Sequence, residues 1–319
     1  MGSSPASRPA EPASGRRLPC TGAPACIVPL VEAESGELLT DRPGMRIVLL
    51  AETEDVSVTH AVVASGGPFP PPHVHREHAD CFLVLDGAVS FRVGAAERVV
   101  EAESWVQVPH GVVHTFAPAG AGQATFVNVH APSRGYGSFV RGLAAATDAE
   151  GRRRAREAFD QFPPPADGGR DPAAAVVRRL GGGEGEAITE RPGRRVTLLA
   201  DTDEAGVTES VYGPGERGPD PHVHREHTDA WLVLEGTLTF ELHDRETFAA
   251  GPGTLVVVPP LAVHGFGNEG DETARFLNLH VPSCGFGDYL RGRNPGFDQH
   301  EPPADGGADP AGVLVRRLG

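Results

Sequence analysis

The chain has 319 residues, enough for two domains that each bury a sizeable core. It carries 28 basic and 43 acidic side chains, a formal net charge of −15, and all of the basic ones are arginine. Because lysine is absent, Schiff-base chemistry and the phosphate-binding lysine of a P-loop are excluded. The negative charge also argues against nucleic-acid and anionic-membrane partners, and neither kind is expected.

The first 25 residues are mainly Ser, Pro, Ala, Gly and Arg. This stretch lacks the apolar segment of a secretory signal, and no run of 18 apolar residues occurs in the chain. We therefore predict a disordered leader at 1–25 on a cytoplasmic protein. The cysteines are Cys20, Cys26, Cys81 and Cys284. They show no paired metal-site spacing, so free thiols in a reducing compartment are expected.

Two copies of one unit account for most of the chain. The segment Pro72–Asp80 recurs as Pro221–Asp229 at an offset of 149 residues. Further along, Phe126–His130 recurs as Phe276–His280 at an offset of 150. Self-similarity at one fixed spacing, maintained over many segments, indicates an internal duplication.

Short segments rich in β-branched and aromatic residues predict strands in both copies. Cys81–Leu85 leads through Asp86-Gly87 into Ala88–Val93, and Trp231–Phe240 repeats this strand–turn–strand pattern. Segments with helical periodicity are few. The predicted fold class is therefore all-β, with a sandwich or barrel in each copy.

The connection that ends the first copy is longer than its counterpart. Phe159-Asp160-Gln161 recurs from Phe297 at an offset of only 138, so about 12 residues are additional in the first copy. They include the arginine-rich run 152–157, for which an exposed helical connector is the expected structure. The segment 175–181 resembles the end of the chain and could belong to either copy. The predicted domains are residues 26–170 and 171–319.

Ten of the 14 histidines occupy matched positions in the two copies. They are His73, His75, His78, His114 and His130, and their counterparts His222, His224, His227, His264 and His280. A His-x-His pair on a strand places both imidazoles on one face. With a nearby carboxylate and a third histidine, such a pair forms a compact N,O cluster that suits divalent Fe, Mn, Ni, Cu or Zn.

These residues belong to two motifs, each present twice. The first motif comprises Gly67, His73, His75, Asp80 and Gly87, and again His222, His224, Asp229 and Gly236. The second comprises Pro109, Gly111 and His114, and again Gly253, Pro259, His264 and Asn268. With both motifs at this spacing, the chain resembles the cupin family, and more closely the quercetin 2,3-dioxygenase-like bicupins.

The resemblance implies two tandem cupin barrels, that is, jelly rolls or double-stranded β-helices, joined by short helical connectors. It also implies one divalent transition metal per domain. The implied ligands are His73, His75, Asp80 and His114 in the first domain and His222, His224, Asp229 and His264 in the second. In place of these aspartates the family usually has a glutamate thought to act as the base, so Asp80 and Asp229 take that catalytic role. Glu77 and Glu226 are alternative carboxylates.

Strand alternation nominates the substrate pocket. Phe82 shares a face with Asp80, and Trp231 shares one with Asp229. Polar pairs near the end of each copy also share one face, opposite to aliphatic neighbours. The predicted pocket residues are Phe82, Asn128, His130, Trp231, Asn278 and His280. The alternative for the polar pairs is a solvent-exposed face.

The function implied by the resemblance is that of an enzyme, a metal-dependent dioxygenase that acts on an enolisable or phenolic small molecule with O2. A redox-neutral isomerase or polyketide cyclase of specialised metabolism is an alternative, with the metal as Lewis acid. A non-catalytic small-molecule-binding cupin is the third hypothesis, and the intact ligand spacing in both copies argues against it. A homodimer is a further possibility. The substrate and the native metal are left open.

Overall fold

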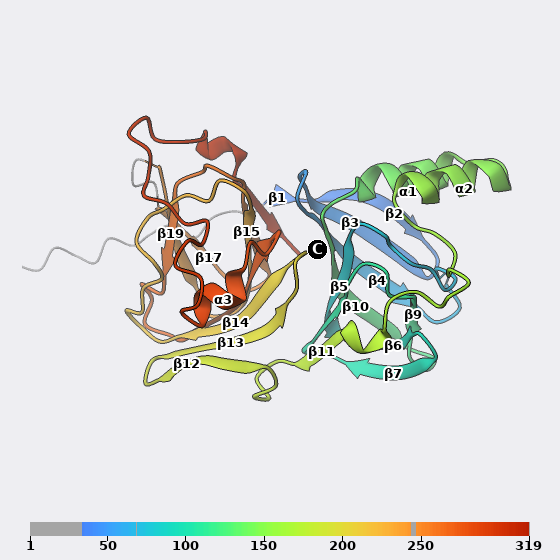
Figure 1. Ribbon diagram of the computed structural model, residues 1–319, viewed down its shortest axis with the longest axis horizontal. Helices are drawn as coiled ribbons and strands as arrows, with labels where there is room; N and C mark the ends of the chain where they lie inside the picture. Colours follow the sequence, from blue (N-terminus) through green and yellow to red (C-terminus); the bar gives the residue numbers. More distant parts are fainter. Residues whose placement is uncertain (1–33, 68, 244–246, 319) are drawn as a thin grey trace, which may run out of the picture.

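The computed structural model describes residues 34–67, 69–243 and 247–318, and two β-units lie side by side in it (Figure 1). The predicted leader, 1–25, which contains Cys20, lies outside the described residues, as does the nearby Cys26. Within those residues, no helix is long and apolar enough to cross a membrane.

The first unit is a sandwich of two sheets, counted over the described residues. Its larger sheet has seven strands in the order β11-β8-β5-β10-β4-β3-β2, and its smaller sheet has the order β7-β6-β9. The strands are β2 (Glu37–Arg42), β3 (Met45–Glu52), β4 (Ser57–Ala64), β5 (Ala79–Asp86), β6 (Ala88–Val93), β7 (Ala96–Glu101), β8 (Ser104–Val108), β9 (His114–Pro118), β10 (Gln123–Ala131) and β11 (Val176–Arg179). Buried side chains of both sheets, such as Phe82 of β5 and Phe91 of β6, pack into one core.

The second unit repeats this arrangement. Its described strands are β12 (Glu186–Arg191), β13 (Arg194–Asp201), β14 (Gly206–Tyr212), β15 (Thr228–Glu235), β16 (Leu238–Leu242), β17 (Thr247–Ala250), β18 (Thr254–Val258), β19 (His264–Gly267), β20 (Ala274–Val281) and β21 (Leu314–Arg317). The larger sheet begins with the short strand β1 (Glu34–Ser35) and has the order β1-β21-β18-β15-β20-β14-β13-β12, and the smaller one has the order β17-β16-β19. The prediction of an all-β chain with two tandem jelly-roll units is confirmed.

The edge strands of the large sheets define where each unit ends. β11 pairs antiparallel with β8 of the first sheet, although it lies beyond residue 171. Strand pairing thus places Val176–Arg179, within the segment 175–181, at the edge of the first sheet. The short strand β1 (Glu34–Ser35) instead pairs in parallel with β21 of the second sheet.

Two glycines of the first motif close the link between the sheets. Gly87 has φ +72°, and a Cβ there would lie 2.2 Å from the carbonyl oxygen of Gln123. Gly236 has φ +66°, with the corresponding distance of 2.2 Å to the oxygen of Thr273. Only glycine fits such a close approach of two backbones at positive φ. The strand–turn–strand prediction is confirmed at both places.

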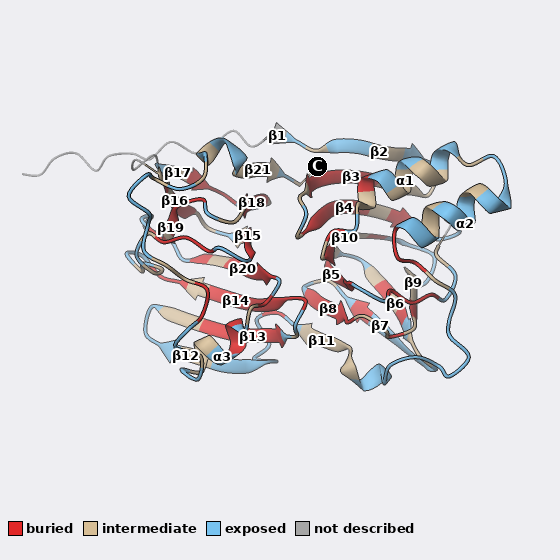
Figure 2. Ribbon diagram, turned by 45° about the horizontal axis from the view of Figure 1, so that its top comes forward, coloured by how far each residue is buried: buried red, intermediate tan, exposed pale blue. Residues whose placement is uncertain are grey.

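Helices are confined to the connections. Among the described residues, the first unit has α1 (Tyr136–Ala145) and α2 (Ala149–Ala158), and the second has α3 (Phe286–Leu290) between β20 and β21. Two short 3-10 turns, Pro172–Ala174 and Pro310–Gly312, precede β11 and β21. The additional residues of the first copy therefore lie in a helical hairpin of α1 and α2 beside its sandwich (Figure 2), and the first turns of α1 are the counterpart of α3. The expected exposed helical connector is α2, which has no buried residue.

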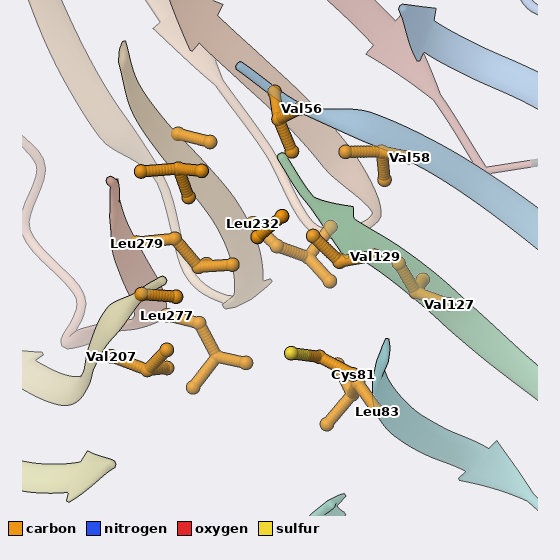
Figure 3. Packing of buried hydrophobic residues seen from close by; sticks show 14 of the residues in the cluster. Val56, Val58, Cys81, Leu83, Val127, Val129, Val207, Leu232, Leu277 and Leu279 are labelled. Carbon is orange, nitrogen blue, oxygen red and sulfur yellow. The ribbon is translucent and has the colours of Figure 1, made fainter. Parts of the chain in front are cut away.

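The two units pack through the outer faces of their large sheets. Val127 and Val129 of β10 meet Leu277 and Leu279 of β20 in one cluster of buried apolar side chains (Figure 3). Burying an aliphatic side chain of this kind contributes about 1.5–3 kcal/mol. Because side chains alternate along a strand, the polar neighbours of these residues point the other way, into each sandwich.

Polar contacts at the edge of this interface are similar in both directions. The backbone N–H of His110, beside the second motif, donates to Glu204 Oε1 at 3.1 Å. The Thr228 hydroxyl, at the start of β15, donates to Asp55 Oδ2 at 2.6 Å. Asp55 and Glu204 are counterparts in the two copies, in the loops that follow β3 and β13. Each unit therefore contacts the strand or loop that carries ligands in its neighbour.

Candidate metal centres

The first cluster consists of His73, His75, Asp80 and His114, all buried, with one donor atom from each within 4.8 Å of all the others. Asp80 is the second residue of β5 and His114 is the first residue of β9. A two-residue backbone bridge joins His73 to His114, with both N–H···O distances at 2.9 Å. The large and small sheets thus bring their ligands together at one end of the sandwich.

The three imidazoles of this cluster have the same orientation. Each Nδ1 lies at hydrogen-bond distance from a backbone carbonyl, which makes Nδ1 the protonated nitrogen and leaves Nε2 as an electron-pair donor. The acceptors are the oxygens of Pro71 (2.9 Å, from His73), Asp160 (2.9 Å, from His75) and Val112 (3.0 Å, from His114). Nε2 of His75 is buried without a hydrogen-bond partner. A divalent transition ion would satisfy this atom, so the donor set fits the predicted metal.

Asp80 is available as an anion. Burial acts to raise its pKa, but His130, His114 and His75 around it hold the pKa well below its usual range. Its Oδ1 accepts a hydrogen bond from Asn128 Nδ2 at 2.5 Å, and its Oδ2 lies 3.3 Å from His114 Nε2. A buried carboxylate held in its charged form among imidazoles is a suitable oxygen ligand.

The second cluster has the same composition: His222, His224, Asp229 and His264, all buried. Each Nδ1 again contacts a backbone carbonyl, at 2.8 Å for His222 with Asp220, at 2.9 Å for His264 with Ala262, and in a short contact for His224 with Asp298. Nε2 of His224 and of His264 lie 3.3 and 3.5 Å from Asp229 Oδ2. Nε2 of His264 is buried without a hydrogen-bond partner, so this donor set fits a metal as well.

A fourth histidine is positioned differently in the two sites. His280 directs Nδ1 toward Asp229, with 2.8 Å to Oδ1, whereas His130 directs Nε2 toward Asp80 at 3.5 Å. Burial lowers the pKa of His130 to about 3, and burial also lowers the pKa of His280. Both rings are therefore neutral at pH 7. The second site offers a further possible ligand group that includes His280 and His227.

The alternative carboxylates are not in the clusters. Glu77 is exposed and pairs with Arg134 at 2.7 Å, and Glu226 is exposed too. In the described residues, the carboxylate that approaches the three histidines is Asp80 in one unit and Asp229 in the other.

Sequence reasoning assigned no role to Asp160 and Asp298, which hold the His-x-His loops in place. The backbone carbonyl of Asp160 accepts a hydrogen bond from His75. The side-chain Oδ2 of Asp160 accepts hydrogen bonds from the backbone N–H groups of Arg76 and Glu77 at 2.9 and 2.7 Å. Asp298 has the same contacts in the second unit. The signal for both was present in the repeated Phe-Asp-Gln motif.

The same aspartates explain the remaining matched histidines. Nδ1 of His78 lies 3.1 Å from Asp160 Oδ2, and Nδ1 of His227 lies 3.0 Å from Asp298 Oδ2. Both rings are fully buried beneath the His-x-His pair. We infer that His78 and His227 help to hold the loop that carries the His-x-His ligands in place.

Each cluster opens into a cavity inside its sandwich, of about 260 Å³ in the first unit and about 280 Å³ in the second. Asn128 and His130 line the first cavity, and Asn278 and His280 line the second. The structure thus places these four predicted pocket residues beside the clusters. Their faces point into the sandwiches, since the opposite faces are in the core between the units.

The aromatic pocket residues are located elsewhere. Phe82 and Trp231 are completely buried, and neither is among the side chains that line the cavities. Phe82 packs on Phe91 and Phe116, and Trp231 packs on Phe240 and Phe266. Phe82 and Trp231 do share a face with the aspartates, which lie two residues earlier on the same strands. At the position of the aromatic rings, however, side chains from the small sheet fill the sandwich. Both are core residues.

Known proteins are similar to this chain in sequence. The family described as cupin domain matches residues 59–130 and 208–280, once in each unit. Quercetin 2,3-dioxygenase of Bacillus subtilis (strain 168) is 25% identical over 272 residues, which cover 76% of this chain and 79% of that protein.

Solved structures agree on the fold. Oxalate decarboxylase of Bacillus subtilis superposes with a TM-score of 0.50 at 18% identity, over 77% of this chain and 74% of that one. AerE of Microcystis aeruginosa superposes with a TM-score of 0.51 at 13% identity, over 77% of this chain and 97% of that one. Each of the two units therefore matches a cupin domain, and each surrounds a buried cluster of three histidines and an aspartate.

Proposed function

We propose that the protein is a metal-dependent dioxygenase that acts on an enolisable or phenolic small molecule. The observation that carries the proposal is the arrangement of each cluster, in which three buried imidazoles, each bonded to a backbone carbonyl through Nδ1, converge with one carboxylate beside a cavity. The similarity to a quercetin 2,3-dioxygenase over most of both chains supports it.

The chain would hold one ion of Fe, Mn, Ni, Cu or Zn in each domain. His73, His75, His114 and Asp80 would bind it in the first domain, and His222, His224, His264 and Asp229 in the second. A bound transition metal would supply Lewis acidity and, for a redox-active ion, electron exchange with O2. The protein's own contribution is to orient the ligands through their carbonyl contacts and to exclude bulk water.

In the first domain, Asn128 and His130 would orient the substrate beside the cluster. Asp80 would accept the proton of a substrate hydroxyl at one carboxylate oxygen, as general base. Its low pKa keeps it in the receptive, unprotonated form at neutral pH. The pair Asn278 and His280 would do the same beside Asp229.

The test is O2 consumption by metal-loaded protein with a panel of flavonols, catechols and 1,3-diketones. We expect O2 uptake in step with substrate loss, and neither in metal-free protein. Turnover at an unchanged rate without O2 would contradict the proposal. Solvent-deuterium incorporation into a substrate without O2 uptake would instead identify an isomerase or cyclase, and tight binding without turnover of any panel member would identify a binding protein.

Elemental analysis tests the two centres separately. Because each cluster has a full donor set, His75→Ala and His224→Ala should each lower the metal content by about half. The double variant should hold almost none, and His243→Ala, outside both clusters, should hold as much as the unaltered protein. A single variant that keeps its full metal content would show that its domain holds no metal.

A further inference from the structure

The two cavities differ in the chemistry of their walls. Along β3 and β4 the first cavity is lined by Met45, Ala61 and Val63. The counterparts along β13 and β14 in the second cavity are Arg194, Ser210 and Tyr212. The first cavity therefore has an apolar wall where the second has a polar one.

The helical hairpin completes the first cavity and adds a charge to it. Phe139, Val140 and Leu143 of α1 and Arg156 of α2 line this cavity. The second unit, which lacks this hairpin, has no equivalent of Arg156. The additional residues of the first copy thus bring a guanidinium to an otherwise apolar side of the cavity.

Arg156 differs from the other arginines of its helix. Arg153 pairs with Glu150 and Glu157 at 2.6 Å, and all three side chains are exposed to solvent. Arg156 is half-buried, and its Nη1 donates to the side chain of Gln161 at 2.5 Å. Over the described part of the chain, no carboxylate forms an ion pair with Arg156. Burial, with Arg152 nearby, lowers the pKa of its guanidinium, but an arginine remains charged at neutral pH.

A second arginine, at the rim of the first cavity, also lacks a carboxylate partner among the described residues. Arg42 lines the cavity and contacts Met45 Sδ at 3.5 Å, with no carboxylate partner among the described residues. Its counterpart in the second unit, Arg191, is neutralised by Glu216 at 2.6 Å. The residue that corresponds to Glu216 in the first copy is Gly67, so the acidic partner is missing there.

Two guanidiniums without carboxylate partners, in a chain of net charge −15, both line one cavity. A guanidinium presents a rigid fork of donors that matches a carboxylate. Building on the dioxygenase function proposed above, we propose that the first cavity selects an amphipathic monocarboxylate: Arg156 binds the carboxylate, assisted by Arg42, and the apolar body lies along Ala61 and Val63 toward the metal cluster. A cavity of about 260 Å³ lies just below the range of drug-sized pockets, which favours a compact ligand.

The test is a binding measurement on full-length protein that does not depend on turnover. Metal-free protein is titrated calorimetrically with cinnamate, 4-phenylbutyrate and octanoate, each compared with its neutral amide, which keeps the apolar body and lacks the charge. We expect at least one acid to bind about tenfold or more tightly than its amide. If no acid is preferred over its amide, the proposal is wrong.

Variants locate the preference within the molecule. Arg156→Gln should abolish the preference for the acid while the amide binds as before, and Arg42→Gln should reduce it. Arg153→Gln, one turn away on the same helix, is the matched control and should leave it unchanged. Circular dichroism checks that α2 is retained in both helix variants.

Two results would overturn the assignment. One is an intact preference in Arg156→Gln, and the other is loss of the preference in Arg194→Gln of the second cavity. This test is independent of the dioxygenase proposal, because the preference for the acid is measured in metal-free protein and does not require O2 uptake. Selective binding with no O2 uptake would refute only the dioxygenase, and O2 uptake without acid preference would refute only this inference.

Discussion

Asp160 joins the end of the first domain to the loop that carries His73 and His75. It accepts hydrogen bonds from His75 through its carbonyl and from two backbone N–H groups and His78 through one carboxylate oxygen. Removing the carboxylate would leave three donors without their partner, two of them backbone groups of the ligand loop. Ligand orientation in this centre therefore depends on a residue about 85 positions away in the sequence.

We expect Asp160→Ala to lower metal affinity in the first domain by about 10–100-fold, as for other groups that orient ligands. It should also reduce the free energy of unfolding by about 1–3 kcal/mol, because buried donors lose their acceptor. Asp167→Ala is the control, since Asp167 accepts one backbone N–H, from Gly169, in an exposed loop. Competition with a chromophoric chelator measures the affinity. Lower stability with unchanged affinity would limit Asp160 to a structural role.

The thiol of Cys284 gives a pH-dependent prediction at the same scale. Burial, together with Asp298 and Glu226, raises its pKa from 9.0 to about 11. Because the thiolate is the nucleophile, alkylation of Cys284 by iodoacetamide should be slow at pH 8 in the folded protein and accelerate toward pH 11. Peptide mapping by mass spectrometry distinguishes it from the other cysteines. Reaction at pH 8 as fast as in urea-unfolded protein would contradict this.

The same shift affects stability. The unfolded thiol ionises at about pH 9 and the folded one at about pH 11, so between these values the unfolded state binds fewer protons. The contribution of Cys284 to the free energy of unfolding is therefore constant below pH 9 and decreases as the pH rises through this window.

At the scale of elements, the alternation of side chains along β5 determines which residues face the interior of the sandwich and which face the neighbouring unit. Asp80 and Phe82 face the interior of the sandwich, while Cys81 and Leu83 face the core between the units. The link between β5 and β6 depends on Gly87, whose backbone passes beside that of Gln123. The turn therefore determines how the large and small sheets are joined.

Gly87→Ala should accordingly be more costly than a glycine substitution at the same φ in open space. Gly120 has φ +71° and no atom within 4 Å of the position that a Cβ would take, so Gly120→Ala should cost only the strain of left-handed backbone, about 1–2 kcal/mol. Gly87→Ala adds a collision with backbone that cannot move aside. Urea denaturation of both variants compares them. Equal losses of stability would show that the strands can shift to accept the methyl group.

Much of the strand arrangement and of the two clusters could be predicted from the sequence, because these features depend on local sequence patterns. The repeat, the strand–turn–strand links and the clustering of His73, His75, Asp80 and His114 follow from periodicity and motif spacing. The depth of Phe82 in the sandwich did not follow, since alternation gives a face but not a distance from the cavity. The contacts of Asp160 and the charge of Arg156 in the cavity also did not follow, because tertiary packing creates them.

At the scale of the whole molecule, the outer faces of the two large sheets form one continuous core. Counterparts from the two copies lie in this core, such as Val129 and Leu279, and Leu83 and Leu232. Polar contacts from Asp55 and Glu204 join the units at the edge. The units should therefore unfold together.

We expect Leu83→Ala to reduce the free energy of unfolding by about 2–5 kcal/mol, because it leaves a cavity between the units. Leu38→Ala should change it by less than about 0.5 kcal/mol, since Leu38 is 52% exposed. Calorimetry should show a single transition for both variants. Two separate transitions for the unaltered protein would contradict the shared core.

The matched residues across this core have a consequence for how the two metal centres coexist. Contacts between equivalent surfaces are typical of twofold homodimers, in which assembly depends on protein concentration. Here the chain itself tethers the two surfaces, which gives them an effective concentration in the millimolar range or above. Dilution therefore does not separate the centres. Each copy can also change its cavity independently, as the hairpin and the missing acidic partner of Arg42 show, without losing its neighbour.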